Sequence, residues 1–148
     1  MTLLTSETVA QVAQEIWTAL LAAEGGSELL PGDLASNEVV SQIHIHGEWN
    51  GTVRLDLSRL AARHATSAMF GMEDDELTDA DITDAVGELV NVMGGNIKGL
   101  VAGPSHLTLP EVTEGLVDSP AGHLELAQEI RFSWMAEPVV VSVWTEPA

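Results

Sequence analysis

Residues 77–100 read LTDADITDAVGELVNVMGGNIKGL and carry the strongest secondary-structure pattern in the chain. Apolar residues recur there at steps of three and four, the spacing of one face of an α-helix: Ile82, Val86, Leu89, Met93, Ile97 and Leu100. Thr78 and Asp81 match a capping box, and acids in the first turn favour the positive end of the helix dipole. The sequence therefore predicts a helix from Thr78 to about Val101 with these six residues facing the core.

The opposite face of this helix is polar and rich in small residues. Four residues follow one another there at steps of four, three and four: Asp84, Glu88, Asn91 and Gly95. Gly87 and Gly94 border them, although a glycine inside a helix costs about 1 kcal/mol relative to alanine. Two interpretations stay open: the glycines let another element of this chain pack closely beside a solvated acidic face, or they leave a bare surface for another protein.

The segments before this helix have recognisable patterns too. Apolar residues from Val9 to Leu21 follow helical spacing, with Ser6 as the expected N-cap and Gly25-Gly26 as the stop. Alternation in 43–46 and 53–57, around a turn at 48–51, predicts a β-hairpin. A second helix is expected from a cap at Ser58 to a left-handed glycine at Gly71, followed by a solvated acidic loop at 73–76.

Three strand-like segments follow Gly103-Pro104, near 106–111, 124–135 and 139–144. The expected turn between the last two is Ala136-Glu137-Pro138. One helix, a hairpin, two helices and three strands indicate an α/β or α+β fold, with a largely antiparallel sheet covered by helices. Without linkers or clear repeats, residues 1–148 are expected to form a single domain.

Composition excludes several classes of function. The 148 residues contain 23 Asp plus Glu against 5 Lys plus Arg, a formal net charge of −18. The few bases are scattered, so neither nucleic acid nor an anionic membrane is an expected partner: Arg54, Arg59, Arg63, Lys98 and Arg131. The chain has no cysteine, which excludes disulfides and thiolate chemistry, and no signal-peptide pattern, so a cytoplasmic location is expected.

Other candidate sites have little support from the sequence. His44 and His46 share one face of a predicted strand and could bind zinc, but no further ligand is evident, so we expect surface histidines. Asp56 and Ser58 have no histidine at the spacing of a hydrolytic triad. The tryptophans are more typical of core or interface positions: Trp17, Trp49, Trp134 and Trp144.

The stretch DAVGELVNVMGGN, residues 84–96, resembles the signature of the CheC, CheX and FliY chemotaxis phosphatases. That signature has Asp or Ser, three residues, Glu, two residues and Asn, then a proline farther along the chain. Three residues fit it in type and spacing: Asp84, Glu88 and Asn91. Pro110 is the natural candidate for the proline and Pro104 the less favoured one. No other asparagine has a glutamate three residues earlier, so the chain is similar to the single-site CheX-like group.

The resemblance implies a CheC/CheX-like fold and an activity. The substrate would be the aspartyl phosphate of a CheY-type response-regulator receiver domain, which supplies Mg²⁺ and a lysine, so that this chain binds no cofactor or metal. Asn91 would orient the attacking water and Glu88 would pair with the receiver lysine. The expected partner-binding residues are those around them: Asp84, Gly87, Gly94 and Gly95.

The family likeness also implies a homodimer in which sheets join edge to edge, with the hairpin from Leu124 to Trp144 as the expected edge. A second function remains open. The chain could be a non-catalytic interaction module that binds receiver domains or flagellar-switch components.

Overall fold

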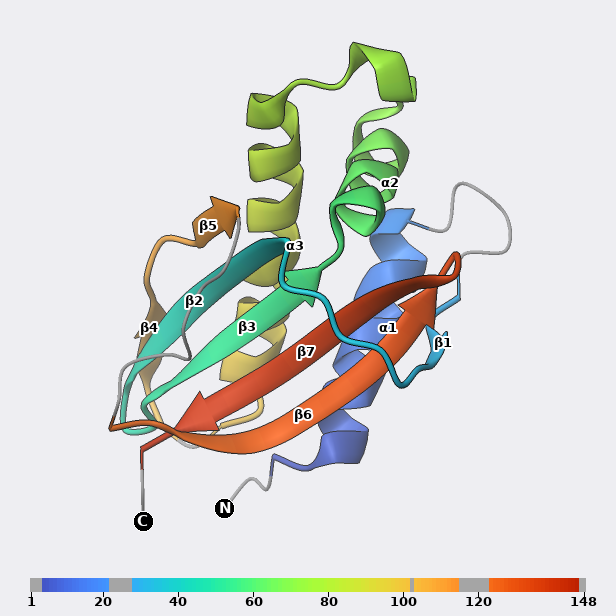
Figure 1. Cartoon of the computed structure of the whole chain (residues 1–148). Helices are drawn as coiled ribbons and strands as arrows, with labels where there is room; N and C mark the ends of the chain where they lie inside the picture. Colours follow the sequence, from blue (N-terminus) through green and yellow to red (C-terminus); the bar gives the residue numbers. More distant parts are fainter. Residues whose placement is uncertain (1–3, 22–27, 102, 115–122, 147–148) are drawn as a thin grey trace.

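In the part of the chain that the structure describes, seven antiparallel strands form one sheet, and three α-helices pack on one of its faces (Figure 1). The computed structural model describes residues 4–21, 28–101, 103–114 and 123–146. Within them the strand order is β1-β6-β7-β3-β2-β4, and β5 also pairs with β2. The elements in chain order are α1 Ser6–Leu21, β1 Leu30–Pro31, β2 Val39–Gly47, β3 Gly51–Leu57, α2 Arg59–Phe70, the 3₁₀ helix η1 Asp74–Glu76, α3 Asp79–Lys98, β4 Ser105–Leu107, β5 Glu111–Glu114, β6 Glu125–Trp134 and β7 Glu137–Thr145.

The α+β fold class and the central hairpin are confirmed. Strands β2 and β3 pair from Val39 with Leu57 to Ile45 with Gly51, so alternate residues point to the helices. The Ser58 hydroxyl accepts a hydrogen bond from the Ala61 amide at 3.0 Å and caps α2. Gly71 ends α2 with φ 63°, the left-handed conformation that glycine adopts without strain.

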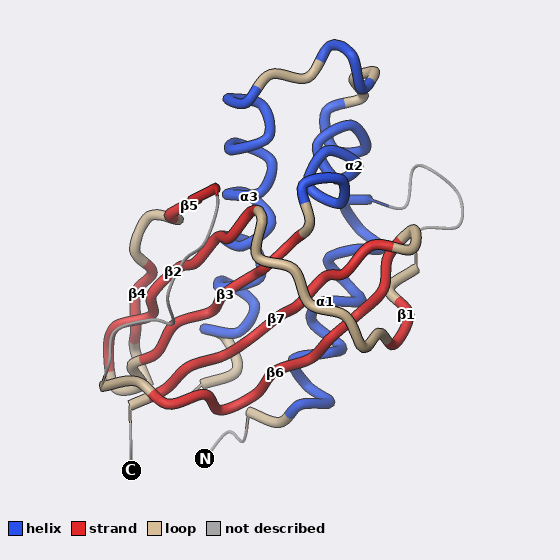
Figure 2. Tube along the Cα trace, in the orientation of Figure 1, coloured by secondary structure: helices blue, strands red, loops and turns tan. Residues whose placement is uncertain are grey.

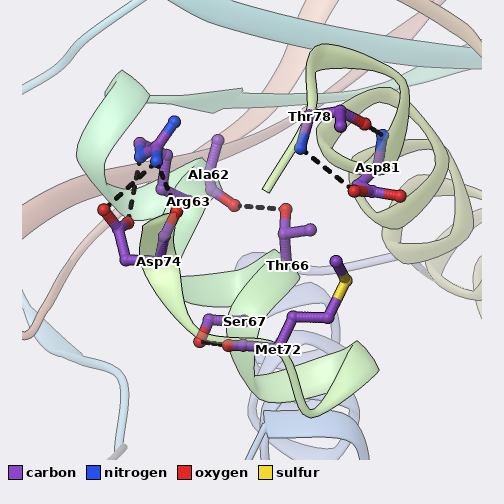
Figure 3. Close-up of polar contacts among 8 residues, drawn as sticks. All are labelled: Ala62, Arg63, Thr66, Ser67, Met72, Asp74, Thr78 and Asp81. Carbon is purple, nitrogen blue, oxygen red and sulfur yellow. Dashed lines mark hydrogen bonds and ion pairs between the residues drawn. The ribbon is translucent and has the colours of Figure 1, made fainter. Parts of the chain in front are cut away.

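Helix α3 begins as its sequence predicts. The Thr78 amide donates to the Asp81 carboxylate at 3.0 Å, and the Asp81 amide donates to the Thr78 hydroxyl at 3.1 Å (Figure 3). Five of the six expected core residues are buried. The sixth, Leu100, is only partly buried, because the helix ends at Lys98 rather than near Val101.

Two further predicted boundaries are wrong. Helix α1 already includes Ser6, because the Thr5 side chain accepts from the Thr8 amide and caps the helix one residue earlier. The Gly25-Gly26 stop lies outside the described residues. The β6–β7 turn lies at Met135 and Ala136, with φ of 50° and 65°, a conformation that usually requires glycine or asparagine. The predicted turn at Ala136-Glu137-Pro138 therefore begins one residue too late, and its last two residues belong to β7.

The expected strand at 106–111 is divided into β4 and β5, and its division positions the functional site. Both pieces pair with β2, but between them residues 108–110 lie opposite only Ile43 and His44. The segment thus has one residue more than its partner strand, which is the definition of a β-bulge. Figure 2 shows this segment at the edge of the sheet beside α3.

The core lies between the sheet and the helices. Trp17 of α1 and Trp134 of β6 meet edge to face with ring centroids 5.6 Å apart, both almost fully buried. The other face of the sheet is polar. There Arg54 donates to Asp56 from two nitrogens, at 2.9 and 3.1 Å. Burial raises the pKa of Asp56, and the Arg54 guanidinium opposes that shift.

Candidate functional site

Helix α3 presents its polar stripe to solvent, as its sequence predicts. Asp84 and Glu88 are exposed and Asn91 is half-buried, whereas Val86, between the two acids on the other face, is fully buried. Residues 88 and 91 are three apart on a helix, so their side chains are neighbours. The stripe therefore places a carboxylate and a carboxamide next to each other on an accessible surface.

A hollow of about 360 Å³ lies where this stripe meets the bulge. It is lined by residues of α3, of the bulge and of β5: Thr83, Asp84, Gly87, Glu88, Asn91, Leu109, Pro110 and Val112. The structure thus brings Pro110 beside Glu88 and Asn91. Pro104 lies elsewhere, at the β2–β3 turn, where its carbonyl accepts from the Glu48 amide at 3.2 Å.

Thr108 fixes the bulge to β2. Its amide donates to the His44 carbonyl, and its hydroxyl accepts from the His44 amide, both at 3.0 Å. The side chain thus supplies the hydrogen bond that the regular ladder loses at the extra residue. Since Pro110 has no amide hydrogen, it fits a position outside the ladder. The next two residues, Leu109 and Pro110, lie beside α3 and line the hollow.

The side chains of Glu88 and Asn91 are not engaged by the protein. Neither makes a hydrogen bond or an ion pair with any other residue in the described part of the chain. Asn96, one turn later, donates instead to the Val92 carbonyl at 2.8 Å, and Asn50 bonds to the Gly47 backbone. The hydrogen-bonding groups of Glu88 and Asn91 are therefore not used within the described part of the chain.

The three glycines near the stripe have different surroundings. A Cβ atom built on Gly94 would lie 2.6 Å from Cγ2 of Ile43 in β2, so this glycine permits close packing of helix on sheet. This packing gives Gly94 a role inside the fold, and its expected contact with a partner stays a prediction. A Cβ atom on Gly87 would make ordinary contacts with Pro110 and Val112, inside the hollow. Gly95 is exposed, and its nearest neighbour would be Leu107 at 4.0 Å.

The surroundings of the stripe are strongly acidic. Residues 73–88 contain eight acids and no base. Arg63 of α2 compensates for one of them, since it donates to the Asp74 carboxylate at 3.0 and 3.1 Å (Figure 3). This hydrogen bond holds the pKa of Asp74 below its usual value. Asp84 and Glu88 line the hollow and make it negative.

Three histidines of β2 and β4 lie on the polar face of the sheet: His44, His46 and His106. His44 shares a 2.7 Å hydrogen bond with Thr52 and lies 3.5 Å from the Glu111 carboxylate. Strand pairing sets His106, which looked isolated in sequence, directly opposite His46, with ring centroids 5.8 Å apart. In residues 4–21, 28–101, 103–114 and 123–146, no group of three or more histidines, cysteines or acids could hold a metal ion.

Sequence reasoning missed Thr108 and Leu109. Both lie inside a stretch that reads as one continuous strand, and the only signal of a break is Pro110. A proline within a strand pattern does indicate a bulge or an edge. It does not reveal that the preceding leucine faces solvent.

No helix in the described part of the chain is long and apolar enough to cross a membrane.

Comparison with known proteins gives one family. The model of the family described as chemotaxis phosphatase CheX matches residues 39–117, which include the α3 stripe and Pro110. Among proteins with curated descriptions, none matches this sequence significantly.

Several solved structures share the fold. The chemotaxis protein CheX from Vibrio vulnificus superposes with a TM-score of 0.76 at 18% identity, over 91% of each chain. CheX from Desulfovibrio desulfuricans gives 0.75 at 20% identity, over 95% of this chain and 98% of that one. A chain of the CheX-CheY-BeF3-Mg²⁺ complex from Borrelia burgdorferi gives 0.70 at 21% identity, over 95% and 97%.

Proposed function

The chain belongs to the CheX family of chemotaxis phosphatases, and from this membership we propose that it hydrolyses the aspartyl phosphate of a CheY-type receiver domain in the cytoplasm. The observation that carries the proposal is the pair Glu88 and Asn91, unengaged and neighbouring on the accessible side of α3. We further propose that residues 1–148 act as one CheX-like domain, with no cofactor of its own.

In the proposed hydrolysis this chain performs only part of the chemistry. Hydrolysis of an acyl phosphate needs a water molecule in line with the breaking bond and stabilisation of charge on the transferring oxygens. The Borrelia complex contains CheY together with BeF3 and Mg²⁺, so in our proposal charge stabilisation belongs to the receiver. The chain then has to position the water. Asn91 suits that role because a carboxamide both donates and accepts hydrogen bonds without carrying charge.

Glu88 has a different role in the proposal. Its carboxylate pairs with a lysine of the receiver and sets the angle at which α3 approaches, so that the Asn91 carboxamide reaches the phosphoryl group. Asp84, Gly87 and Gly95 line the same approach, with Gly95 exposed and Gly87 beneath Pro110. No general base or nucleophile is required from this chain, because water held in line by Asn91 is the nucleophile.

The test compares two asparagines of one helix. Receivers from the same genome are phosphorylated, and loss of acyl phosphate is followed with wild type, Asn91→Ala and Asn96→Ala. We expect Asn91→Ala to slow hydrolysis about 100-fold, the scale of a lost positioning contact. Asn96→Ala should retain wild-type rates, since the Asn96 carboxamide is bonded within its own helix. If wild type accelerates no receiver, the proposal fails.

Glu88→Gln separates docking from chemistry. It keeps the size of the side chain and removes the charge that pairs with the lysine, so KM should rise while kcat changes less. Should Asn91→Ala bind and act in cells like wild type while no dephosphorylation is seen, the chain is instead a non-catalytic module that binds receivers or flagellar-switch components.

We also propose a homodimer formed through the edge of the sheet. Strand β7 lies inside the sheet between β3 and β6, so of the expected hairpin only β6 offers an edge. In the described residues β1 pairs with β6 only at Ser133 and Phe132, which leaves residues 125–130 without a strand on that side. Light scattering coupled to gel filtration tests this, and a monomeric mass at micromolar concentration contradicts it.

A further inference from the structure

Leu109 is the most exposed large hydrophobic residue in the described part of the chain. It is 85% exposed. A leucine this exposed gains almost none of the roughly 1.5–3 kcal/mol that burial of its side chain provides. It nevertheless lines the same hollow as Glu88 and Asn91. The stability of the folded chain therefore does not explain why a leucine occupies this position.

The backbone on both sides of Leu109 is fixed. Thr108 is bonded to the His44 backbone through its amide and its hydroxyl, and the hydroxyl also lies 3.3 Å from the Leu109 carbonyl as a donor. Pro110 restricts its own backbone and packs over Gly87 of α3. The two neighbours of Leu109 in the chain, Thr108 and Pro110, therefore hold its backbone in place. An apolar group held in place loses less conformational entropy on binding than one on a mobile loop.

The rest of the hollow is polar and acidic, with Thr83, Asp84, Glu88 and Asn91 on the α3 side. Charged groups at an interface mainly fix orientation and encounter rate, whereas buried apolar anchors supply most of the affinity. Beside Leu109 the only other apolar lining comes from Pro110 and Val112, which already pack on this chain.

We propose that Leu109 is the apolar anchor of the receiver interface, inserting into an apolar depression of the receiver next to its phosphorylated aspartate. The inference rests on the proposed function, because it names the receiver domain as the occupant of this surface. The observation that supports the inference is that Leu109, Glu88 and Asn91 line one hollow. Leu109 determines which receivers bind, and Asn91 acts on those that do.

The test uses two leucines that are exposed in different places. Leu34, 70% exposed in the segment between β1 and β2, lies outside the hollow and provides the control. Binding of a receiver loaded with beryllofluoride and Mg²⁺ is measured by titration calorimetry for wild type, Leu109→Ala, Leu109→Met and Leu34→Ala. Steady-state dephosphorylation gives KM and kcat for the same four proteins.

We expect Leu109→Ala to raise Kd and KM about tenfold, equivalent to about 1.4 kcal/mol, with kcat at saturation unchanged. Leu109→Met should restore most of the affinity, because methionine has a similar volume, and Leu34→Ala should match wild type. Urea unfolding should be the same for all four, since both leucines are exposed. That combination separates an anchor from a residue that merely supports the fold.

Two results overturn the inference while the proposed function stands: Leu109→Ala binds as tightly as wild type, or it lowers kcat at unchanged KM. If wild type binds the receiver through Leu109 and hydrolyses nothing, the inference holds and the enzymatic function fails. If wild type binds no receiver, both fail.

Discussion

Gly94 and Gly95 are adjacent in α3 but face opposite environments. A Cβ atom on Gly94 would meet the Ile43 methyl group at 2.6 Å, and that methyl sits on a stiff, fully buried, β-branched side chain. Overpacking of this kind costs about 1–3 kcal/mol, which exceeds the gain in helix propensity of up to about 1 kcal/mol. Gly94→Ala should therefore lower the free energy of unfolding by about 1 kcal/mol, measured by urea denaturation.

Gly95→Ala is the matched control at the neighbouring position. Its new methyl group would find only Leu107 at 4.0 Å, so the propensity gain remains and stability should equal or exceed that of wild type. Equal stabilities for the two variants would contradict the packing role of Gly94. Sequence alone could not make this distinction. Both glycines lie near the polar stripe on a helical wheel, and only the position of β2 shows which of them touches the sheet.

The bulge between β4 and β5 is the element on which the site depends. Thr108→Val keeps the shape of the side chain but leaves the His44 amide without its 3.0 Å acceptor. Loss of such a hydrogen bond costs about 1 kcal/mol. We expect hydrogen exchange at the His44 amide to become about fivefold faster, together with a rise in KM for the phosphorylated receiver as Leu109 and Pro110 lose their fixed position.

Thr113→Val, at an exposed position of β5, is the control for the loss of a threonine hydroxyl. It should leave His44 exchange and KM unchanged. If Thr108→Val also leaves His44 protected, water or a shifted backbone replaces the hydroxyl and the bulge does not depend on it.

The same element shows where prediction from sequence reaches its limit. The start and buried face of helix α3, the β2–β3 hairpin and the caps at Ser58 and Thr78 are predicted correctly, because local spacing and local hydrogen bonds determine them. Helical spacing places Glu88 and Asn91 on one polar face, and the resemblance to the family signature singles them out as a motif. The bulge depends on how residues 105–114 pair with β2, a contact distant in sequence. Leu109 and Thr108 could not be assigned without it.

The charge of the whole molecule governs how it meets its partner. The chain has a formal charge of −18, with eight acids between residues 73 and 88, around the surface that a phosphorylated receiver approaches in the proposed function. Of these acids Asp74 is paired with Arg63, while Asp84 and Glu88 stay exposed in or beside the hollow. The receiver presents carboxylates and a phosphoryl group of its own at that site, so long-range repulsion opposes the encounter.

Salt should therefore speed association with an acidic receiver. The Debye length falls from about 30 Å at 0.01 M to about 8 Å at 0.15 M, which screens distant charges far more than groups in contact. We expect the association rate constant for a beryllofluoride-loaded receiver, measured by stopped-flow fluorescence, to increase over this range. The dissociation rate constant should rise as well, because salt weakens the proposed ion pair between Glu88 and the receiver lysine. An association rate that falls with added salt would contradict net repulsion, because it requires a basic rim on the receiver that attracts the acids of α3 before contact is made.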